Sequence, residues 1–328
     1  MARFRIGIDV GGTFTDICLF NEDSKQVFVE KTSSTPEDSS LGIREGLKNI
    51  LSSIGASGKE VVYLAHGTTV ATNTLLQHNG ARTGLITTKG FRDLLEIGRQ
   101  TRPNLYDLQV DKPEPLVPRD LRLEVTERVY SDGRVLLPLD DRECREAARK
   151  MKEAGVEAVA ICLLHSYVNP QHELAVKSMV QEMLPEAFIS VSHEVMPEFR
   201  EYERLSTTVV NAYLGPVVRN YVSKLGERIR ELDTNVGVYI TQSNGGMISL
   251  QRAQDDPVRT VLSGPSTGVI GAAHTARAWR ADRRRAPAAR NLRPLPRGWT
   301  RETSISCPES RPATSCLAAV PTPAHSAV

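Results

Sequence analysis

The chain has 328 residues, of which 40% are hydrophobic and 24% are charged, and its formal net charge at pH 7 is +2. This length suits two ordinary domains, and this composition excludes a fibrous or broadly disordered chain. Apolar runs fall short of the roughly 18 to 20 residues that a membrane span needs, and the N-terminus has the pattern of a strand. The five scattered cysteines exclude a zinc knuckle and a disulfide framework. We therefore predict a cytoplasmic protein that contacts no membrane.

The C-terminal segment, residues 277–328, differs sharply from the rest of the chain. It holds ten Arg and three acidic residues, no Lys, both tryptophans and seven of the nineteen prolines. Because no periodic apolar face survives in it, we predict a disordered tail. A basic tail can bind nucleic acid, but the lack of Lys and of a folded patch with interleaved aromatic residues argues against that partner.

The first half of the chain predicts strands and then an alternation of helices and strands. Alternating apolar residues predict three antiparallel strands within residues 4–32, and a 3.6-residue period predicts a helix over 36–55. The alternation that follows predicts an α/β sheet with covered faces. Its predicted strands are 61–67 and 82–88, its predicted helices are 69–80 and 90–99, and 101–120 is a long loop.

The second half continues the alternation and then changes character. A hairpin is predicted over residues 121–140, with its turn at Asp132 and Gly133. A helical run over 202–232 begins a second domain, with a kink or break expected at Pro216. The other predicted helices are 140–154, 170–184 and the one that starts after 265, and the other predicted strands are 156–164, 189–195, 236–241, 246–250 and 258–262.

Residues 8–16 carry the strongest chemical signal. Here a strand runs into two glycines, hydroxyl side chains alternate, and the carboxylates Asp9 and Asp16 flank the turn. Glycines let backbone amides approach a phosphate, and the two carboxylates can hold Mg²⁺ through water molecules. An ordinary hairpin turn has the same residue types, so that alternative stays open. The predicted nucleotide-binding residues of this turn are Gly11, Gly12, Thr13 and Thr15.

Three further segments combine polar residues with the ends of predicted strands. His66 and Thr68 lie where a strand ends and a helix begins, a place that favours an anion; alternatively, Thr68 caps the helix and His66 is a satisfied buried histidine. Gly245 and Gly246 follow a strand and Gly264 precedes a helix, so these glycines either line a ligand cleft or form tight turns.

An acidic segment follows the last strand of the first half. His193 and the nearby carboxylates of Glu198, Glu201 and Glu203 can supply metal ligands or a general base. Acidic residues are also favoured at the start of a helix by its dipole, and both alternatives stay open.

Together these residues resemble the hydantoinase A and 5-oxoprolinase family of the sugar kinase, actin and Hsp70 superfamily. The resemblance starts with the Asp-x-Gly-Gly-Thr-x-Thr-Asp version of the first phosphate motif, and it covers about residues 3–277. The blocks that follow in the family's order are 66–73, 84–93, 192–204, 242–246 and 263–265.

The resemblance implies an α/β fold, namely an actin-like ATPase lobe with a mixed sheet, the start of a second lobe and the disordered tail. It divides the chain into an N-terminal domain over 1–196, the beginning of the hydantoinase A domain over 197–276, and the tail over 277–328. The implied reaction is ATP-dependent ring opening of a five-membered lactam or cyclic imide, in which the carbonyl oxygen is phosphorylated and water then opens the ring. Implied cofactors are ATP and Mg²⁺, and a partner subunit of the hydantoinase B type is expected. With the resemblance, we predict catalytic roles for Asp9, His66 and Thr68.

The tail departs from the family, whose members continue to a second phosphate motif. The abrupt change to Arg, Ala and Pro is typical of translation in a shifted reading frame, so we expect a truncated chain that is inactive alone. The alternatives to the implied reaction are an inactive truncated fragment and, from the family's relatives, an acetone carboxylase-like subunit. A sugar kinase is disfavoured, because no Gly-x-x-x-Asp-like block is found.

Overall fold

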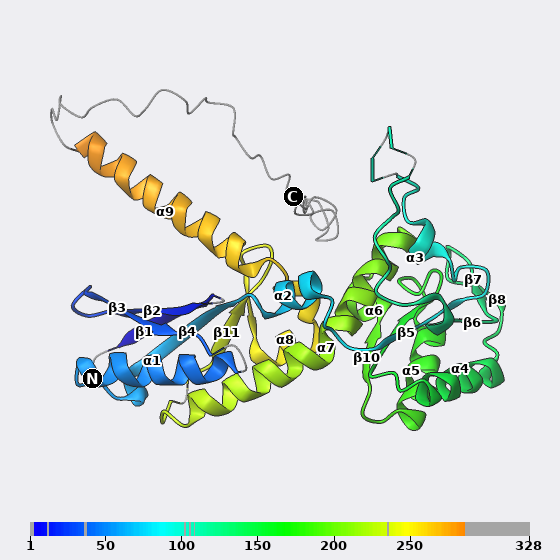
Figure 1. Cartoon of the computed structure of the whole chain (residues 1–328), viewed down its shortest axis with the longest axis horizontal. Helices are drawn as coiled ribbons and strands as arrows, with labels where there is room; N and C mark the ends of the chain where they lie inside the picture. The colour runs from blue at the N-terminus through cyan, green and yellow to red at the C-terminus, as the bar shows by residue number, and fades with distance from the viewer. Residues whose placement is uncertain are drawn as a thin grey trace, which may run out of the picture.

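The computed structural model describes residues 3–11, 13–35, 38–101, 103–104, 106–107, 109–234 and 236–285. Gly12, one of the predicted nucleotide-binding residues, lies outside them, as do residues 286–328 of the expected tail. The described residues form two large sheets, which the long helix α7 (Glu201–Arg230) joins, and a small two-stranded sheet, as Figure 1 shows.

The first sheet is mixed and has six strands in the order β12-β11-β4-β1-β2-β3. The prediction of three antiparallel opening strands is confirmed, and β4 and β11 then pair in parallel on the other side of β1. The strands are β1 (Phe4–Val10), β2 (Phe14–Asn21), β3 (Val27–Ser33), β4 (Val61–Thr68), β11 (Val238–Thr241) and β12 (Met247–Ser249).

Helices cover one face of this sheet. Side chains alternate strictly between buried and exposed along β1, as expected of a strand with one dry face. The buried face packs against α1 (Ser39–Ser53) and the C-terminal half of α7, whose Val218 and Leu225 belong to the same core as Ile6 and Ile17. In Figure 1 these two helices and α8 (Leu250–Asp255) lie below the sheet, and α9 (Ser263–Arg285) rises above it.

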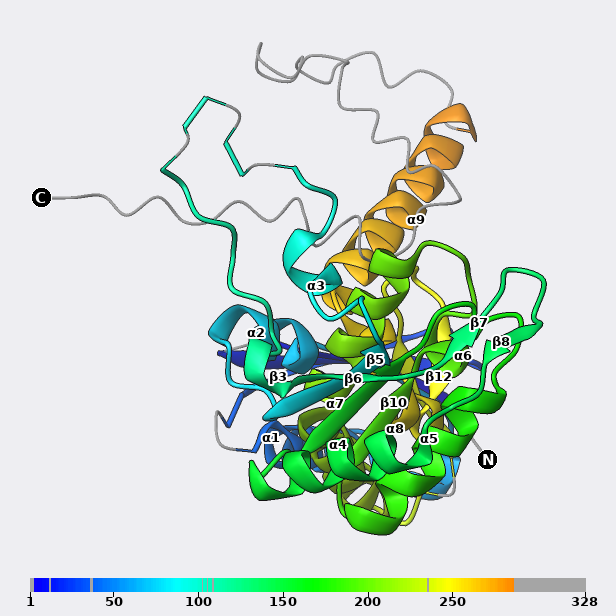
Figure 2. The ribbon, with the colours of Figure 1, turned by 90° about the vertical axis from the view of Figure 1, so that its right-hand side faces the viewer.

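The second sheet is entirely parallel, in the order β10-β9-β5-β6. Helices α4 (Asp141–Glu153) and α5 (Gln171–Met183) pack on one face, seen in Figure 2, and the N-terminal half of α7 packs on the other. Every residue of β5 and β9 is buried, because parallel sheets are covered on both faces. The strands are β5 (Thr83–Thr88), β6 (Arg122–Val125), β9 (Ala158–Cys162) and β10 (Phe188–Val191).

Helix α7 is continuous through Pro216, so of the predicted kink or break the break does not occur. Its two halves pack on the two cores, so tertiary contacts hold it together across the proline. Gly215 allows this packing, because a Cβ at that position would lie 2.3 Å from the ring of Phe188 on β10. The helix therefore links the two large sheets.

Other segments also differ from the predictions. Residues 122–125 form a strand of the parallel sheet, and the hairpin is only β7 (Arg128–Val129) with β8 (Val135–Leu137), turned at Gly133 with φ 86°. The predicted strand at 258–262 is instead largely a 3₁₀ helix. The remaining elements are α2 (Val70–Gln77), α3 (Leu94–Ile97), α6 (Ser192–Val195) and the 3₁₀ helices Gly58–Glu60, Arg119–Leu121 and Pro257–Thr260.

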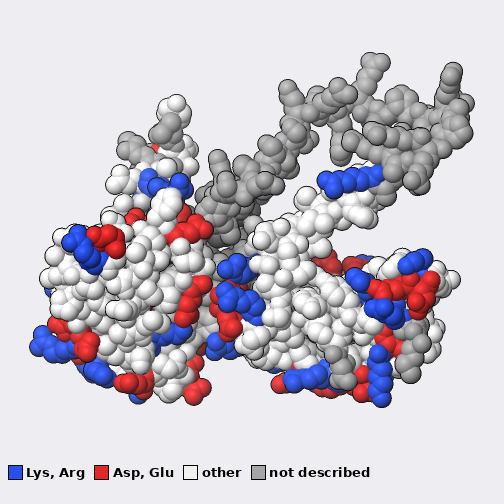
Figure 3. Space-filling view, turned by 180° about the vertical axis from the view of Figure 1, so that it is seen from behind, with Lys and Arg blue, Asp and Glu red and all other residues white. Residues whose placement is uncertain are grey.

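Helix α9 extends away from the first sheet, and it includes residues 277–285 of the segment that was expected to be disordered. Val269 and Ile270 are 69% and 50% exposed, as expected for an apolar helix face without a covering sheet. Figure 3 shows the same helix from behind, where its described surface is largely free of Lys, Arg, Asp and Glu. None of the helices in the described ranges is long and apolar enough to span a membrane.

Candidate functional site

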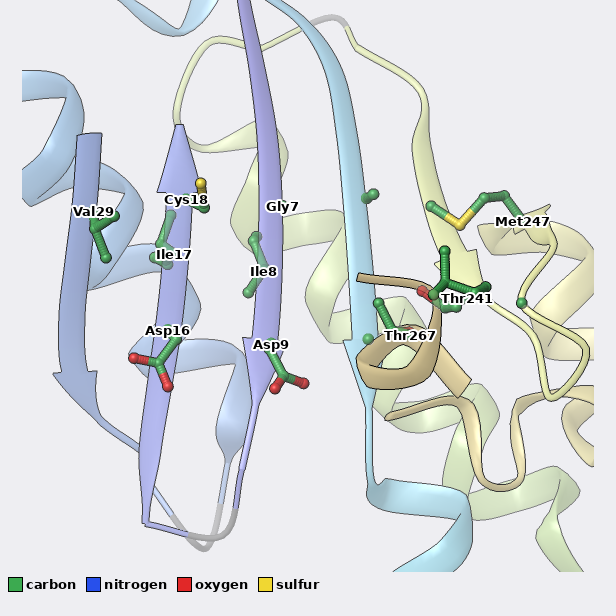
Figure 4. A pocket seen from close by; sticks show the side chains of 14 residues that line it. Gly7, Ile8, Asp9, Asp16, Ile17, Cys18, Val29, Thr241, Met247 and Thr267 are labelled. Carbon is green, nitrogen blue, oxygen red and sulfur yellow. The ribbon is translucent and has the colours of Figure 1, made fainter. Parts of the chain in front are cut away.

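A pocket of about 330 Å³ lies on the open face of the first sheet, at the base of α9. Figure 4 shows that its floor consists of neighbouring strands and that the two aspartates lie at one end. The polar lining comes from Asp9 and Asp16 and from Thr241 and Thr267, whereas the opposite end is apolar. The pocket therefore combines carboxylates, hydroxyl groups and a hydrophobic wall.

Asp9 and Asp16 share this face because they are direct partners across β1 and β2. Burial raises the pKa of the Asp9 carboxyl above its ordinary value, and the neighbouring charge of Asp16 raises it further. Asp16 also pairs with Lys31, whose Nζ lies 2.6 Å from its Oδ1. Two carboxylates that face one pocket give this end of it a negative potential that favours a cation.

The turn between β1 and β2 is held from its buried side. The Gly11 amide donates to the Phe14 carbonyl at 3.0 Å, so this predicted phosphate donor is occupied within the turn. Ser34 donates its hydroxyl to the Gly11 carbonyl at 2.9 Å, and Thr15 lies 3.0 Å from that hydroxyl. Thr15 is fully buried and does not reach the pocket. Thr13 is exposed, and its carbonyl accepts a hydrogen bond from the Ser34 amide.

His66 and Thr68 lie on the covered face, away from the aspartates. His66 is 0% exposed, and its Nε2 lies 2.5 Å from the hydroxyl oxygen of Tyr221 on α7. Burial lowers the pKa of His66 to about 4, so its ring is neutral at pH 7. Thr68 is buried and accepts a hydrogen bond from the Val70 amide at 3.2 Å. The structure does not bring these two predicted catalytic residues into the pocket.

The three predicted glycines lie around the base of α9. Gly245 lines the pocket with φ 81°, in the left-handed region that glycine adopts without strain. The Gly246 amide donates to the Asn244 side chain at 2.8 Å, which closes the turn. Gly264 lies near Thr69, whose hydroxyl donates to the Val10 carbonyl at 3.3 Å. Gly264 is therefore near the end of β1.

His193, in the acidic segment after β10, belongs to a separate cluster beside the second sheet. The buried carboxylate of Glu173 accepts from the Ser192 hydroxyl at 2.6 Å and lies 2.7 Å from Nδ1 of His193. Glu203 pairs with Arg99 instead of joining them. Among the described residues, no group of three or more His, Cys, Asp and Glu side chains is placed to hold a metal ion.

Sequence reasoning missed three residues near the aspartates, namely Lys31, Gly67 and Thr267. Strand register could have found two of them, because Lys31 is the partner of Asp16 and Gly67 is the partner of Asp9. Thr267 comes from α9, and only the tertiary fold brings it to the pocket.

Two known family models match this chain. The hydantoinase/oxoprolinase N-terminal region matches residues 5–184, and the hydantoinase/oxoprolinase model matches residues 204–283. The chain belongs to the hydantoinase/oxoprolinase family. The resemblance that the motifs indicated is thereby confirmed.

Members of this family with assigned names align with most of this chain. Caprolactamase subunit alpha of Pseudomonas jessenii is 39% identical over 272 residues, and 5-oxoprolinase 1 of Arabidopsis thaliana is 33% identical over 304 residues. The alignments cover 81% and 83% of this chain but only 39% and 24% of those proteins. The chain thus spans less than half the length of either relative.

Solved structures of family members support the fold. Nucleotide-free acetone carboxylase superposes with a TM-score of 0.78 at 29% identity, covering 85% of this chain and 41% of that chain. ATP-dependent caprolactamase from Pseudomonas jessenii superposes with a TM-score of 0.72 at 37% identity, covering 80% and 39%. The expected α/β fold of the actin-like ATPase type, with a mixed sheet, is confirmed.

Proposed function

We propose that this chain is the nucleotide-binding N-terminal part of an ATP-dependent enzyme that opens a five-membered lactam or cyclic imide, of the 5-oxoproline or hydantoin type. The observation that carries the proposal is the pair of facing carboxylates, Asp9 and Asp16, in a pocket on the open face of the mixed first sheet. The names of two relatives, 5-oxoprolinase and ATP-dependent caprolactamase, support the lactam class.

The donor set of the pocket fits Mg²⁺. Carboxylate and hydroxyl oxygens are the protein ligands of this hard cation, which keeps most of its waters beside a nucleotide. Burial and, to a smaller extent, the charge of Asp16 raise the pKa of Asp9, and a bound cation would offset both effects by favouring the ionised carboxylate. Asp9 and Asp16 would hold Mg²⁺, which when bound neutralises phosphate charge during phosphoryl transfer.

The other predicted residues support the site in different ways. Gly245 lets the loop approach the pocket, and Thr15 with Ser34 fixes the carbonyl of Gly11 from below. A predicted catalytic contact of His66 or Thr68 with substrate would need movement of β4, since both are buried. We propose that these two residues hold the strand in place.

We further propose that this chain does not turn over ATP alone. Phosphoryl transfer depends on preorganised groups in a site that excludes water, and here the aspartates face an open pocket. A partner subunit of the hydantoinase B type is proposed, since relatives are named as subunits. The domain limits at 196 and 276 and a cytoplasmic location also remain proposals.

Carboxylation of a small ketone is the second candidate reaction. It is favoured by the superposition on acetone carboxylase with a TM-score of 0.78. Both reactions would start by activating a carbonyl oxygen, so the same carboxylates serve either one.

Ligand-observed NMR on the purified chain with Mg²⁺ and ATP separates these candidates. We expect 5-oxoproline or hydantoin to bind, with no substrate-stimulated ATP hydrolysis. Binding of acetone but of neither ring compound would favour the ketone reaction. Failure of all three to bind would contradict the proposed substrate classes, and substrate-stimulated turnover by the chain alone would contradict its proposed inactivity.

A further inference from the structure

Gly67 lies on the floor of the pocket, where an added methyl group would contact the carboxylate of Asp9. Gly67 on β4 is the partner of Asp9 on β1, so it lies beside the aspartate on the same face of the sheet. A Cβ built on Gly67 would lie 3.4 Å from Asp9 Oδ1 and 4.0 Å from the Thr267 hydroxyl oxygen. The space above Gly67 is therefore the gap between a carboxylate and a hydroxyl group.

The neighbouring positions show that this gap is specific to Gly67. Two residues earlier on the same strand and face, Ala65 has a methyl group and also lines the pocket. On β1, a Cβ at Gly7 would meet nothing within 4 Å. The fold thus accommodates small side chains along this floor, and only the one at Gly67 would contact Asp9.

Thr267 completes the gap from the side of α9. Its hydroxyl donates to the Ser263 carbonyl at 2.8 Å, so its own hydrogen is used and its lone pairs remain free to accept. A carboxylate and an accepting hydroxyl on either side of an open floor suit water molecules that are bound to a cation, because such waters are strong hydrogen-bond donors.

We propose that Gly67 and Thr267 are positioning residues for the hydrated Mg²⁺ of a bound nucleotide: Gly67 keeps the floor clear, and the Thr267 hydroxyl accepts from a metal-bound water. This inference rests on the proposed nucleotide-binding function. It adds Gly67 on β4 and Thr267 on α9 to the residues that the sequence indicated for this site.

The test is calorimetric titration of the full chain with ATP, once with Mg²⁺ and once with EDTA. Gly67→Ala is expected to weaken the Mg²⁺-dependent affinity at least tenfold and to leave the affinity in EDTA unchanged, because its methyl group would occupy the space beside Asp9 where the metal-bound waters would lie. Gly271→Ala on α9 is the matched control, since a Cβ there meets nothing within 4 Å and Gly271 does not line the pocket. Its affinity should stay within twofold of wild type.

A second pair of variants keeps the test independent of folding at Gly67. Thr267→Val preserves the shape of the side chain but removes its hydroxyl, and it should weaken only the Mg²⁺-dependent affinity, whereas Thr267→Ser should restore it. Wild-type affinity in both Gly67→Ala and Thr267→Val would overturn this inference and leave the proposed function standing. Absence of ATP binding by the wild-type chain, with Mg²⁺ present, would overturn both.

Discussion

The two sheets of this protein bury their residues in different ways. In the second sheet, β5 and β9 are buried at every position because helices cover both faces. In the first sheet, β1 alternates between buried and exposed residues because helices cover one face only. The open face is where Asp9 and Asp16 lie, so the comparison shows that one sheet supplies stability and the other also supplies a charged site.

The largest expected effect is on stability and separates the two sheets. Leu85→Ala in β5 removes a side chain that is 0% exposed, and it should reduce the free energy of unfolding by about 2–5 kcal/mol. Val29→Ala on the open face of β3, where the side chain is 69% exposed, should change it by less than about 0.5 kcal/mol. Urea denaturation followed by circular dichroism measures both, and equal losses would mean that the first sheet is covered in solution.

The covered face of the first sheet should exclude water as well as the core of the second sheet does. The pH dependence of stability that His66 causes tests this. Burial lowers the pKa of His66 to about 4, whereas the unfolded chain protonates this ring below about 6.5. The folded state should therefore lose about 3 kcal/mol of stability as the pH falls from 6.5 to 4. His66→Gln should flatten this dependence relative to wild type in denaturation at several pH values.

Tyr221→Phe is the control for this experiment, because it removes the hydroxyl partner but keeps the buried imidazole. Its stability should still fall between pH 6.5 and 4. If His66→Gln and wild type instead lost stability in parallel, His66 would be protonated in the folded protein and its face of the sheet would be wet.

A smaller effect of the opposite sign is expected on the open face. Burial and Asp16 raise the pKa of Asp9, so the ionised form destabilises the fold above that pKa, and the penalty is absent below the unfolded pKa near 3.8. Asp9→Asn should raise the Tm at pH 7, by less than about 3 °C because the group is partly solvated, and leave it unchanged at pH 3. A lower Tm at pH 7 would show that the carboxylate has a stabilising partner instead.

Much of this organisation could be predicted from local sequence patterns. The alternation in residues 4–10 indicates one dry face, and the same period places Asp9 and Asp16 on the opposite one. That period also places Thr15 on the buried side, against its predicted contact with nucleotide. Alternate residues of a strand face opposite sides of the sheet. This alternation should therefore be checked before a hydroxyl group near a turn is assigned to a ligand.

The remaining features depend on contacts between distant residues. Pro216 indicates a kink or break, but α7 is continuous through it and its two halves pack on the two cores. The pattern of residues 122–125 is that of one strand of a hairpin. In the structure they pair in parallel with β5 and form the edge strand of the second sheet. His66 follows the pattern of a ligand at a strand end, and only the position of Tyr221, far along the chain, shows that its ring is buried. No local pattern contains these pairings.

The central claim is that the open face of the first sheet binds a nucleotide through the two aspartates. Calorimetric titration of the purified chain with ATP and Mg²⁺, compared with Asp9→Ala, tests it most directly. We expect weak, Mg²⁺-dependent binding to the wild-type chain and its loss in Asp9→Ala, with the variant still folded by circular dichroism. Equal Mg²⁺-dependent affinity in the two proteins would contradict the claim.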